Sequence, residues 1–230
     1  MSAYDQFATV YDDWSEHMTD DVGWYVELAR EADGPVVELA VGNGRVAVPV
    51  ARALRRPVIG IDSSPAMLEG ARARAAAAGV QLDLRLGDMR ELELEVSAAL
   101  VTCPFRSLLH LPTWSDRRRV FERVASVLCP GGRFAWNAFV FDPQIAVRHD
   151  GVHAEQNGIG HVVHHHPHDN RIDIVLDSGA SVSLWWVTRS EWEGLLDVSG
   201  LELEALYGNF AREPFGQGSR EFVWVARKAA

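Results

Sequence analysis

Short apolar segments alternate with amphipathic, helix-like segments along the first two thirds of the chain. The predicted strands are residues 36–41, 57–62, 80–88, 96–105 and 131–141, and the predicted helices are residues 44–55, 63–79 and 115–128. Strand and helix therefore alternate with short connections, which predicts a parallel sheet with right-handed crossovers and helices on both faces. The fold class that follows is α/β, with a doubly wound and mostly parallel sheet.

Cap residues mark the ends of the predicted helices. Ser63 or Ser64 is the expected N-cap of the second helix, with Pro65 in its first turn and Gly79 at its carboxyl end. Ser115 is the expected N-cap of the third helix.

The pattern changes in the last third of the chain. Residues 160–187 predict two or three strands around the polar turns HPHDN and DSGAS. A helix pattern at 188–200 and two strands near 201–208 and 219–227 follow. The section 146–187 is therefore predicted to be a small antiparallel β insertion.

The composition narrows the function classes. The chain has 230 residues, of which 47% are hydrophobic, enough for the core of one ordinary domain with an appendage. Its 22 basic and 32 acidic residues give a formal net charge of -10, and no stripe of Lys or Arg suits a nucleic acid. No segment has the pattern of a signal peptide or a bilayer span, and two cysteines make no disulfide framework. We therefore predict a cytoplasmic protein that binds neither nucleic acid nor membrane.

A glycine loop follows the first predicted strand. The run Gly42-Asn43-Gly44-Arg45-Val46-Ala47 fits the pattern G-x-G-x-x-G/A, and Asp62 follows Gly42 by 20 residues, at the end of the next strand. Taken alone, this pattern indicates a dinucleotide site, or a turn that serves only helix–strand packing.

Two further acidic residues favour a cationic nucleoside over a dinucleotide. Glu38 lies in the strand before the loop, where a carboxylate suits a cationic group and opposes a pyrophosphate. Asp88 follows the third strand and can accept a hydrogen bond from an adenine amino group. Acidic side chains at three successive strands therefore indicate S-adenosylmethionine rather than NAD.

Four motifs in order resemble those of the class I S-adenosylmethionine-dependent methyltransferases. They are VVELAVGNG at 36–44, GIDSSPAML at 60–68, LGDMREL at 86–92 and VLCPGGRFAW at 127–136. The resemblance covers nearly the whole chain and implies a seven-stranded sheet whose last strand is antiparallel. Ala40 departs from the motif, because it occupies the position of the family's first glycine.

The resemblance also implies roles for individual residues. Backbone from Ala40 to Gly44 lines the methionine portion, Asp62 binds the ribose hydroxyls, and the segment of Cys103 forms the floor beside the sulfonium. The full predicted cofactor set is Tyr11, Trp14, Glu38, Ala40, Gly42, Asn43, Gly44, Asp62, Ser63, Met67, Gly87, Asp88, Met89 and Cys103. Tyr11 and Trp14 belong to the segment ATVYDDW, which resembles an N-terminal lid over the cofactor; an N-terminal helix anchored by these aromatics is the alternative.

His110 is the candidate catalytic base. It lies in the run Ser107-Leu108-Leu109-His110-Leu111, which resembles the S-x-x-H/Y-L run of aminosugar N-methyltransferases. An imidazole with an ordinary pKa is suited to remove a proton near neutral pH. The alternative is a loop histidine with a structural hydrogen bond.

The segment GHVVHHHPHDNRIDIV at 160–175 concentrates histidines. On a strand, His164, His166 and His168 would share one face and could hold a metal. However, Pro167 breaks the strand and no carboxylate or thiolate stands at ligand spacing, so no metal is predicted. We predict instead that His164 and His166, with Trp185, line the acceptor site. Tyr207, at the end of a later strand, is a candidate for substrate contact, with a packing role as the alternative.

The predicted protein is a methyltransferase that acts on N or O of a small molecule, as a monomer or a homodimer. Its predicted parts are an N-terminal helical lid (1–33), an S-adenosylmethionine-binding domain (34–145 and 188–230) and the β insertion over the acceptor site (146–187). The alternatives are an NAD-dependent oxidoreductase and a non-catalytic S-adenosylmethionine-binding protein. The only lysine is Lys228, which excludes a lysine-assisted hydride relay from the first alternative.

Overall fold

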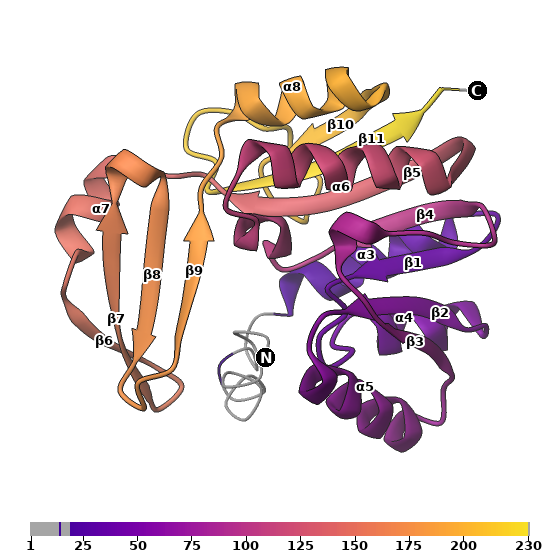
Figure 1. Ribbon diagram of the computed structural model, residues 1–230, viewed down its shortest axis with the longest axis horizontal. Helices are drawn as coiled ribbons and strands as arrows, with labels where there is room; N and C mark the ends of the chain where they lie inside the picture. The colour runs from indigo at the N-terminus through magenta and orange to yellow at the C-terminus, as the bar shows by residue number, and fades with distance from the viewer. Residues whose placement is uncertain (1–13, 15–18, 230) are drawn as a thin grey trace.

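Two β-sheets organise the computed structural model, which describes Trp14 and residues 19–229. A seven-stranded sheet A is covered by helices, and a four-stranded sheet B stands beside it (Figure 1). The predicted Tyr11 lies outside the described residues.

Sheet A has the strand order β10-β11-β5-β4-β1-β2-β3. Its strands are β1 (Val36–Leu39), β2 (Val58–Asp62), β3 (Leu82–Leu86), β4 (Ala98–Cys103), β5 (Leu128–Phe139), β10 (Leu201–Tyr207) and β11 (Glu221–Lys228). The pairs among β1 to β5 are parallel, whereas β11 runs antiparallel to both β5 and β10. The predicted doubly wound, seven-stranded and mostly parallel sheet is confirmed.

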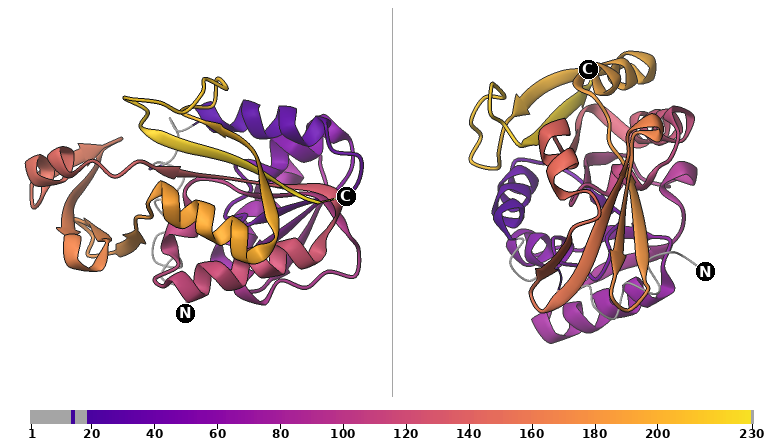
Figure 2. Two further views of the ribbon diagram at one scale, coloured as in Figure 1. Left: turned by 90° about the horizontal axis from the view of Figure 1, so that it is seen from above. Right: turned by 90° about the vertical axis from the view of Figure 1, so that its left-hand side faces the viewer.

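Helices cover sheet A on both faces. They are α3 (Asp20–Arg30), α4 (Ala47–Leu54) and α5 (Pro65–Ala78) with one hydrophobic cluster, and α6 (Trp114–Val127) and α8 (Arg189–Ser199) with another. Two views show these layers from the side and from above (Figure 2). The α6 side holds the largest fully buried side chains, with the rings of Trp136 and Trp224 stacked 5.6 Å apart.

Cap chemistry explains where two of these helices begin. The side chain of Ser64 accepts a hydrogen bond from Met67 N–H, so Ser64 rather than Ser63 is the N-cap of α5. The predicted cap Ser115 is wrong: Thr113 has extended backbone and its side chain accepts from Asp116 N–H, so α6 begins one residue before Ser115. Either hydroxyl residue satisfies the sequence rule, and only the backbone conformation selects one.

Sheet B is an antiparallel insertion between β5 and α8. Its order is β6-β7-β8-β9, with β6 (His153–Gln156), β7 (Ile159–His166), β8 (Arg171–Leu176) and β9 (Ser181–Trp185). The short helix α7 (Pro143–His149) leads into it, and the 3-10 turn η3 (Pro167–Asp169) joins β7 to β8. The small antiparallel insertion is confirmed, but the expected two or three strands are four, because exposed β6 lacks the apolar alternation that marks a strand in a sequence.

Sheet B lies beside the edge of sheet A at which the parallel strands end, with β9 nearest to sheet A (Figure 1). The carboxyl ends of the parallel strands of sheet A therefore lie on the same side of the molecule as sheet B. No helix in the described part of the chain is long and apolar enough to cross a membrane.

Candidate active site

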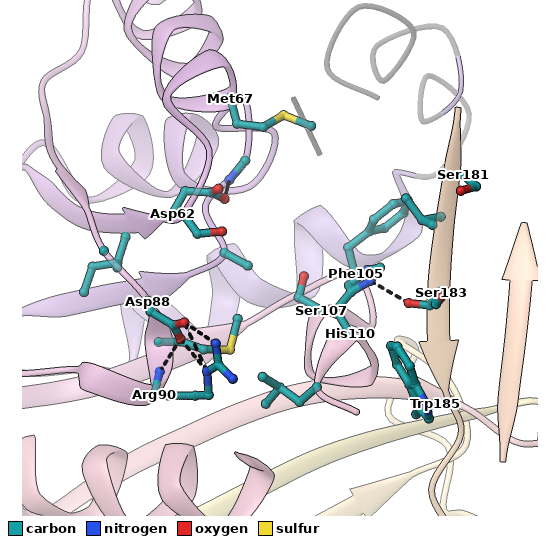
Figure 3. A pocket seen from close by; sticks show the side chains of 18 residues that line it. Asp62, Met67, Asp88, Arg90, Phe105, Ser107, His110, Ser181, Ser183 and Trp185 are labelled. Atoms are coloured by element: carbon teal, nitrogen blue, oxygen red, sulfur yellow. Dashed lines mark hydrogen bonds and ion pairs between the residues drawn. The ribbon is translucent and has the colours of Figure 1, made fainter. Parts of the chain in front are cut away.

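A cavity of about 470 Å³ lies between the carboxyl ends of the sheet A strands and β9 (Figure 3). A pocket of this size at this edge is the usual ligand site of an open α/β sheet. The predicted site residues that line it are Ala40, Gly42, Asp62, Ser63, Met67, Gly87, Asp88, Met89, His110 and Trp185. Residues separated by up to about 145 positions in the sequence thus meet in one cavity.

The glycine loop makes its turn with three residues of positive φ. Ala40, Gly42 and Gly44 have φ values of 51°, 54° and 79°. A side chain at Gly44 would lie 3.2 Å from Val48 Cγ2 and 3.4 Å from Ala71 Cβ, so a glycine here allows α4 and α5 to pack closely against the loop. Ala40 takes the left-handed conformation despite its side chain, which is a modest strain at the wall of the cavity.

Asp62 is held in place by the loop on one side and by α5 on the other. Its Oδ2 accepts from Gly42 N–H and its Oδ1 from Ser64 N–H, both at 2.8 Å. The residue is only 9% exposed, yet it lines the cavity. A carboxylate oxygen accepts more than one hydrogen bond, so these bonds orient the group and leave it suited to a pair of ribose hydroxyls.

Asp88 lies at the end of β3 and is paired with Arg90, a residue that the sequence analysis missed. Arg90 donates to Asp88 from its backbone N–H at 2.9 Å and from its guanidinium at 2.6 Å, and it also binds Asp116 Oδ1 at 2.8 Å. This guanidinium lowers the pKa of Asp88 below its usual value, so Asp88 is ionised at neutral pH. Arg90 itself lines the cavity beside Met89.

The residues present fit an adenosyl cofactor on the sheet A side of the cavity. Asp62 offers a fixed carboxylate, while Met67, Met89 and Leu111 offer apolar surface around it. This donor set matches a ribose and a base with no phosphate, because Arg90, whose guanidinium is the one among the described residues that lines the cavity, is already paired with Asp88 and Asp116.

Besides Trp14, which is described below, four predicted cofactor residues do not line the cavity: Glu38, Asn43, Gly44 and Cys103. Glu38 is 3% exposed, and its burial raises its pKa to about 8 against the opposing effect of Arg45. Burial likewise raises the pKa of the Cys103 thiol, which is therefore neutral. Contact of these four residues with a cofactor stays a prediction.

Arg45 connects the glycine loop to α3 and to the cavity wall. Its guanidinium makes two hydrogen bonds of 2.6 Å to the carboxylate of Asp21, and it lies 4.5 Å from the ring centre of Phe105. Phe105 lines the cavity. The N-terminal helix thus supports the wall through a charged contact of low exposure.

His110 ends the 3-10 helix η2 (Ser107–His110) and bridges the two sheets. Its Nδ1 lies 3.0 Å from the backbone oxygen of Ser183 in β9. A carbonyl only accepts hydrogen bonds, so Nδ1 carries the proton and Nε2 carries the lone pair of the neutral ring. Burial lowers the pKa of His110 to about 4, against the expectation of an ordinary value, so the ring is neutral throughout the physiological range.

The loop before η2 has a strained backbone that a buried network holds. Phe105 and Arg106 have φ values of 58° and 62°, which side chains of L-residues rarely adopt. Arg106 donates to both carboxylate oxygens of Glu221, at 2.7 and 3.1 Å. Asn137 Nδ2 donates to the same carboxylate at 2.7 Å, and Tyr25 O–H donates to Asn137 Oδ1 at 3.1 Å. No local sequence signal marks these partners.

The predicted substrate residues have different positions in the structure. Trp185 lines the cavity, while the next residue, Trp186, stacks on Phe141 at 4.2 Å. His164 is exposed, and His166 Nε2 lies 2.9 Å from Asp173 Oδ2. Tyr207 packs against the hydrophobic cluster on the α3 side and does not line the cavity. Within the described residues, no group of three or more His, Cys, Asp or Glu side chains is arranged to hold a metal ion.

Trp14 lies against sheet B and α5. It forms a buried cluster with Met67 and with Leu176, Ala180 and Val182 of the β8–β9 hairpin. Its backbone oxygen accepts from Gln156 Nε2 at 2.9 Å, and its ring meets the ring of His161 edge-on at 5.0 Å. Trp14 thus touches the cavity-lining Met67 from behind, and a direct cofactor contact stays a prediction.

Residues 36–132 match a family described as a methyltransferase domain. By sequence, the chain is 30% identical over 145 residues to 27-O-demethylrifamycin SV methyltransferase of Amycolatopsis mediterranei, covering 62% of this chain and 52% of that protein. It is also 32% identical over 112 residues to a ubiquinone biosynthesis O-methyltransferase of Xanthomonas axonopodis, covering 47% and 45%. The chain thus spans about half the length of the proteins that it matches by sequence.

Solved structures match over the whole chain. The CcbJ methyltransferase from Streptomyces caelestis is 28% identical with a TM-score of 0.84, covering 100% of this chain and 99% of that one. The sugar N-methyltransferase KedS8 from Streptoalloteichus has the same fold, with a TM-score of 0.68 at 17% identity and coverage of 99% and 93%.

The fold and the cavity resemble those of class I S-adenosylmethionine-dependent methyltransferases. Residues 36–132 match a methyltransferase domain, and the solved methyltransferase structures match over the whole chain, sheet B included. The predictions of the family, of a methyltransferase and of S-adenosylmethionine as its cofactor are confirmed, and nothing in these matches supports an NAD-dependent oxidoreductase.

Proposed function

We propose that this chain methylates a nitrogen or oxygen of a small molecule bound between the adenosyl site and β9, with His110 contacting the reacting atom. The observation that supports this is the shared cavity, whose one wall carries Asp62 and Asp88 and whose other wall carries Ser183 and Trp185. His110 lies at the junction of the two walls (Figure 3). S-adenosylmethionine supplies an electrophilic methyl group on a cationic sulfur; the chain has to position the nucleophile in line with it.

The low pKa of His110 determines what this side chain can do. Moving a proton to it from an ammonium with a pKa of about 10.4 would cost about 9 kcal/mol, since one pKa unit corresponds to about 1.4 kcal/mol. His110 therefore does not deprotonate a cationic amine. Its neutral Nε2 accepts a hydrogen bond from an N–H or O–H group and directs the lone pair of that atom toward the methyl group.

This argument favours an amine that arrives neutral over an aliphatic alcohol. A neutral amine already has the lone pair that attacks, and its excess proton is lost only after methylation. An alcohol must lose its proton during the reaction, and a base with a pKa of about 4 assists that poorly. Several structural neighbours are described as N-methyltransferases that act on sugars or glycopeptides, which agrees with a nitrogen acceptor.

The surroundings of the reaction follow from composition. We propose that the reaction takes place in the cytoplasm on a free small molecule. The net charge of -10 and the lack of a basic stripe in the sequence argue against a nucleic acid as acceptor. We further propose that residues 1–33 act as a lid, that 34–145 and 188–230 bind the cofactor, and that 146–187 select the acceptor, in a monomer or homodimer.

Two measurements test the function. Calorimetric titration with S-adenosylmethionine, S-adenosylhomocysteine and NADH should give saturable binding of the two sulfur compounds alone. Methyl transfer from labelled S-adenosylmethionine should then occur with amines or alcohols of a small-molecule panel. Cofactor binding without turnover on any acceptor would favour a non-catalytic binding protein, and binding of NADH alone would refute the proposal.

A further inference from the structure

The strand β9 is the edge strand of sheet B, and its unpaired side faces the cavity. Among the strands of the described residues, β9 has one neighbour, β8, in the order β6-β7-β8-β9. Four residues of β9 line the cavity together with His110: Ser181, Val182, Ser183 and Trp185. Figure 3 shows β9 passing along the side of the cavity opposite Asp62 and Asp88.

The hydrogen-bond pattern shows which backbone groups point to the cavity. In an antiparallel pair, alternate residues direct both N–H and C=O toward the partner strand, and the others direct both away. The even-numbered residues face β8, since Trp186 N–H donates to Asn170 O and Ala180 O accepts from Leu176 N–H, both at 2.8 Å. Ser183 O faces the other way, because it accepts from His110.

The odd-numbered residues therefore present a row of backbone donors and acceptors to the cavity. Within the described part of the chain, His110 is the group that binds this edge, at Ser183 O. The Ser183 hydroxyl does not occupy the main-chain groups of this edge, because it donates across the hairpin to Asp173 Oδ1 at 2.6 Å. The edge thus offers an N–H donor at Ser183, and donor–acceptor pairs at Ser181 and Trp185.

We infer that the acceptor carries a secondary amide that pairs with this edge as an added strand would. The inference rests on the proposed function and names its substrate class: an amine with a peptide-like amide nearby. The amide carbonyl accepts from Ser183 N–H, and an amide N–H donates to the carbonyl of Ser181 or Trp185. An exposed strand edge recognises extended amides in this way, with the main chain supplying the hydrogen bonds.

The position of His110 sets the distance between the amide and the methylated atom. Because His110 binds the carbonyl of Ser183 itself, an amide at this residue lies within a few bonds of a nucleophile at His110 Nε2. An α-amino amide satisfies both contacts at once. The Trp185 ring, farther along the same edge, then covers the remainder of the acceptor.

Matched acceptors and variants of one residue test this inference. The probes are alanine N-methylamide, alanyl-alanine amide and alanine methyl ester, which lacks the amide N–H. With labelled S-adenosylmethionine, kcat/KM for the amides should exceed that for the ester by at least tenfold. Ser183→Pro removes the N–H that would donate to the carbonyl of amide and ester alike, so it should lower kcat/KM for all three probes by about tenfold. Proline is tolerated at this position because an edge strand does not need that N–H for pairing. Ser183→Ala removes the hydroxyl alone and should keep the preference.

A spectroscopic measurement covers the case in which Ser183→Pro does not fold. In the wild-type protein with 15N-labelled serine and bound S-adenosylhomocysteine, the Ser183 amide signal should shift on addition of alanyl-alanine amide. Equal rates for amide and ester in the wild-type protein, unchanged rates in Ser183→Pro, or no shift and no turnover with any of these probes would overturn the amide inference. Loss of S-adenosylhomocysteine binding would instead refute the proposed function.

Discussion

The two walls of the cavity differ in how their polar groups are fixed. On the sheet A wall, Asp62 is bound by two backbone N–H groups, and Asp88 is bound by the backbone and side chain of Arg90. On the β9 wall, the groups that face the cavity are main-chain groups of an edge strand, joined to the rest of the protein at Ser183 O. The side chains of the sheet A wall are therefore held in fixed positions, which suits a ligand that does not vary. The β9 wall offers main-chain donors and acceptors that any amide can use, so its selectivity depends on the neighbouring side chains.

The largest expected effect concerns the sheet A wall. Asp62→Ala removes a charged hydrogen-bond acceptor for the cofactor and leaves two backbone N–H groups without their partner. A charged hydrogen bond contributes about 1.5–3 kcal/mol, so affinity for S-adenosylhomocysteine should fall by about 10- to 100-fold. Calorimetry measures this. Asp83→Ala, an exposed carboxylate on β3, should leave affinity unchanged; equal losses in both variants would contradict the placement of Asp62.

His110, at the junction of the walls, should have the next largest effect. His110→Ala should lower kcat by about 30-fold with little change in cofactor affinity, because misplacing a reacting atom costs up to about 100-fold. His110→Gln retains a donor for Ser183 O and should recover part of the activity.

The pH dependence of activity distinguishes the protonation of His110 from the protonation of the acceptor. Because burial lowers the pKa of His110 to about 4, its protonation should reduce activity only near that pH and should leave no inflection near 6.5. The unfolded chain binds this proton more tightly than the folded protein does. The contribution of the neutral His110 ring to the free energy of unfolding is therefore complete above pH 6.5 and is lost as the pH falls toward 4. Titration of the His110 ring by NMR measures this, and an inflection near 6.5 would contradict the buried neutral ring.

Loss of the Arg106–Glu221 contact, which supports the strained loop before η2, should have a smaller effect. Glu221→Gln weakens the bidentate contact with Arg106, so the loop that carries Phe105 and His110 should relax and kcat/KM should fall by about tenfold. Cofactor affinity should stay the same. Glu122→Gln, in an exposed pair with Arg118, should change neither quantity measurably. If Glu221→Gln lowers stability but leaves the acceptor KM and kcat unchanged, the network has no role in positioning.

The smallest expected effect concerns the two adjacent indoles of the β9 segment. Trp185→Leu removes an aromatic surface of the acceptor wall and should raise the acceptor KM by about threefold, since aromatic contacts contribute about 0.5–1.5 kcal/mol. Trp186→Leu loses the stack on Phe141 and should lower the melting temperature with no change in KM. The reverse assignment of effects would show that the opposite face of β9 meets the acceptor.

The sequence by itself determined most of the sheet A wall. Parallel strands end at one edge, so an acidic residue at the end of β2 and another after β3 had to lie close together whatever the details of packing. Local chemistry also marked Ser64 as a possible cap and Gly42 as a left-handed turn. These features depend on neighbours within a few positions, which a sequence pattern records.

Only the tertiary structure decided the chemistry of His110 and the role of β9. The protonated nitrogen of His110 is set by a carbonyl 73 positions away, and its pKa by burial between two sheets. Arg106 and Glu221 are 115 positions apart, and nothing near either one predicts the pair. The residues of β9 whose main-chain groups point to the cavity depend on the register with β8, and a shift by one residue would exchange them. Such long-range contacts leave no periodic trace in the sequence, because each depends on how separate elements pack in space.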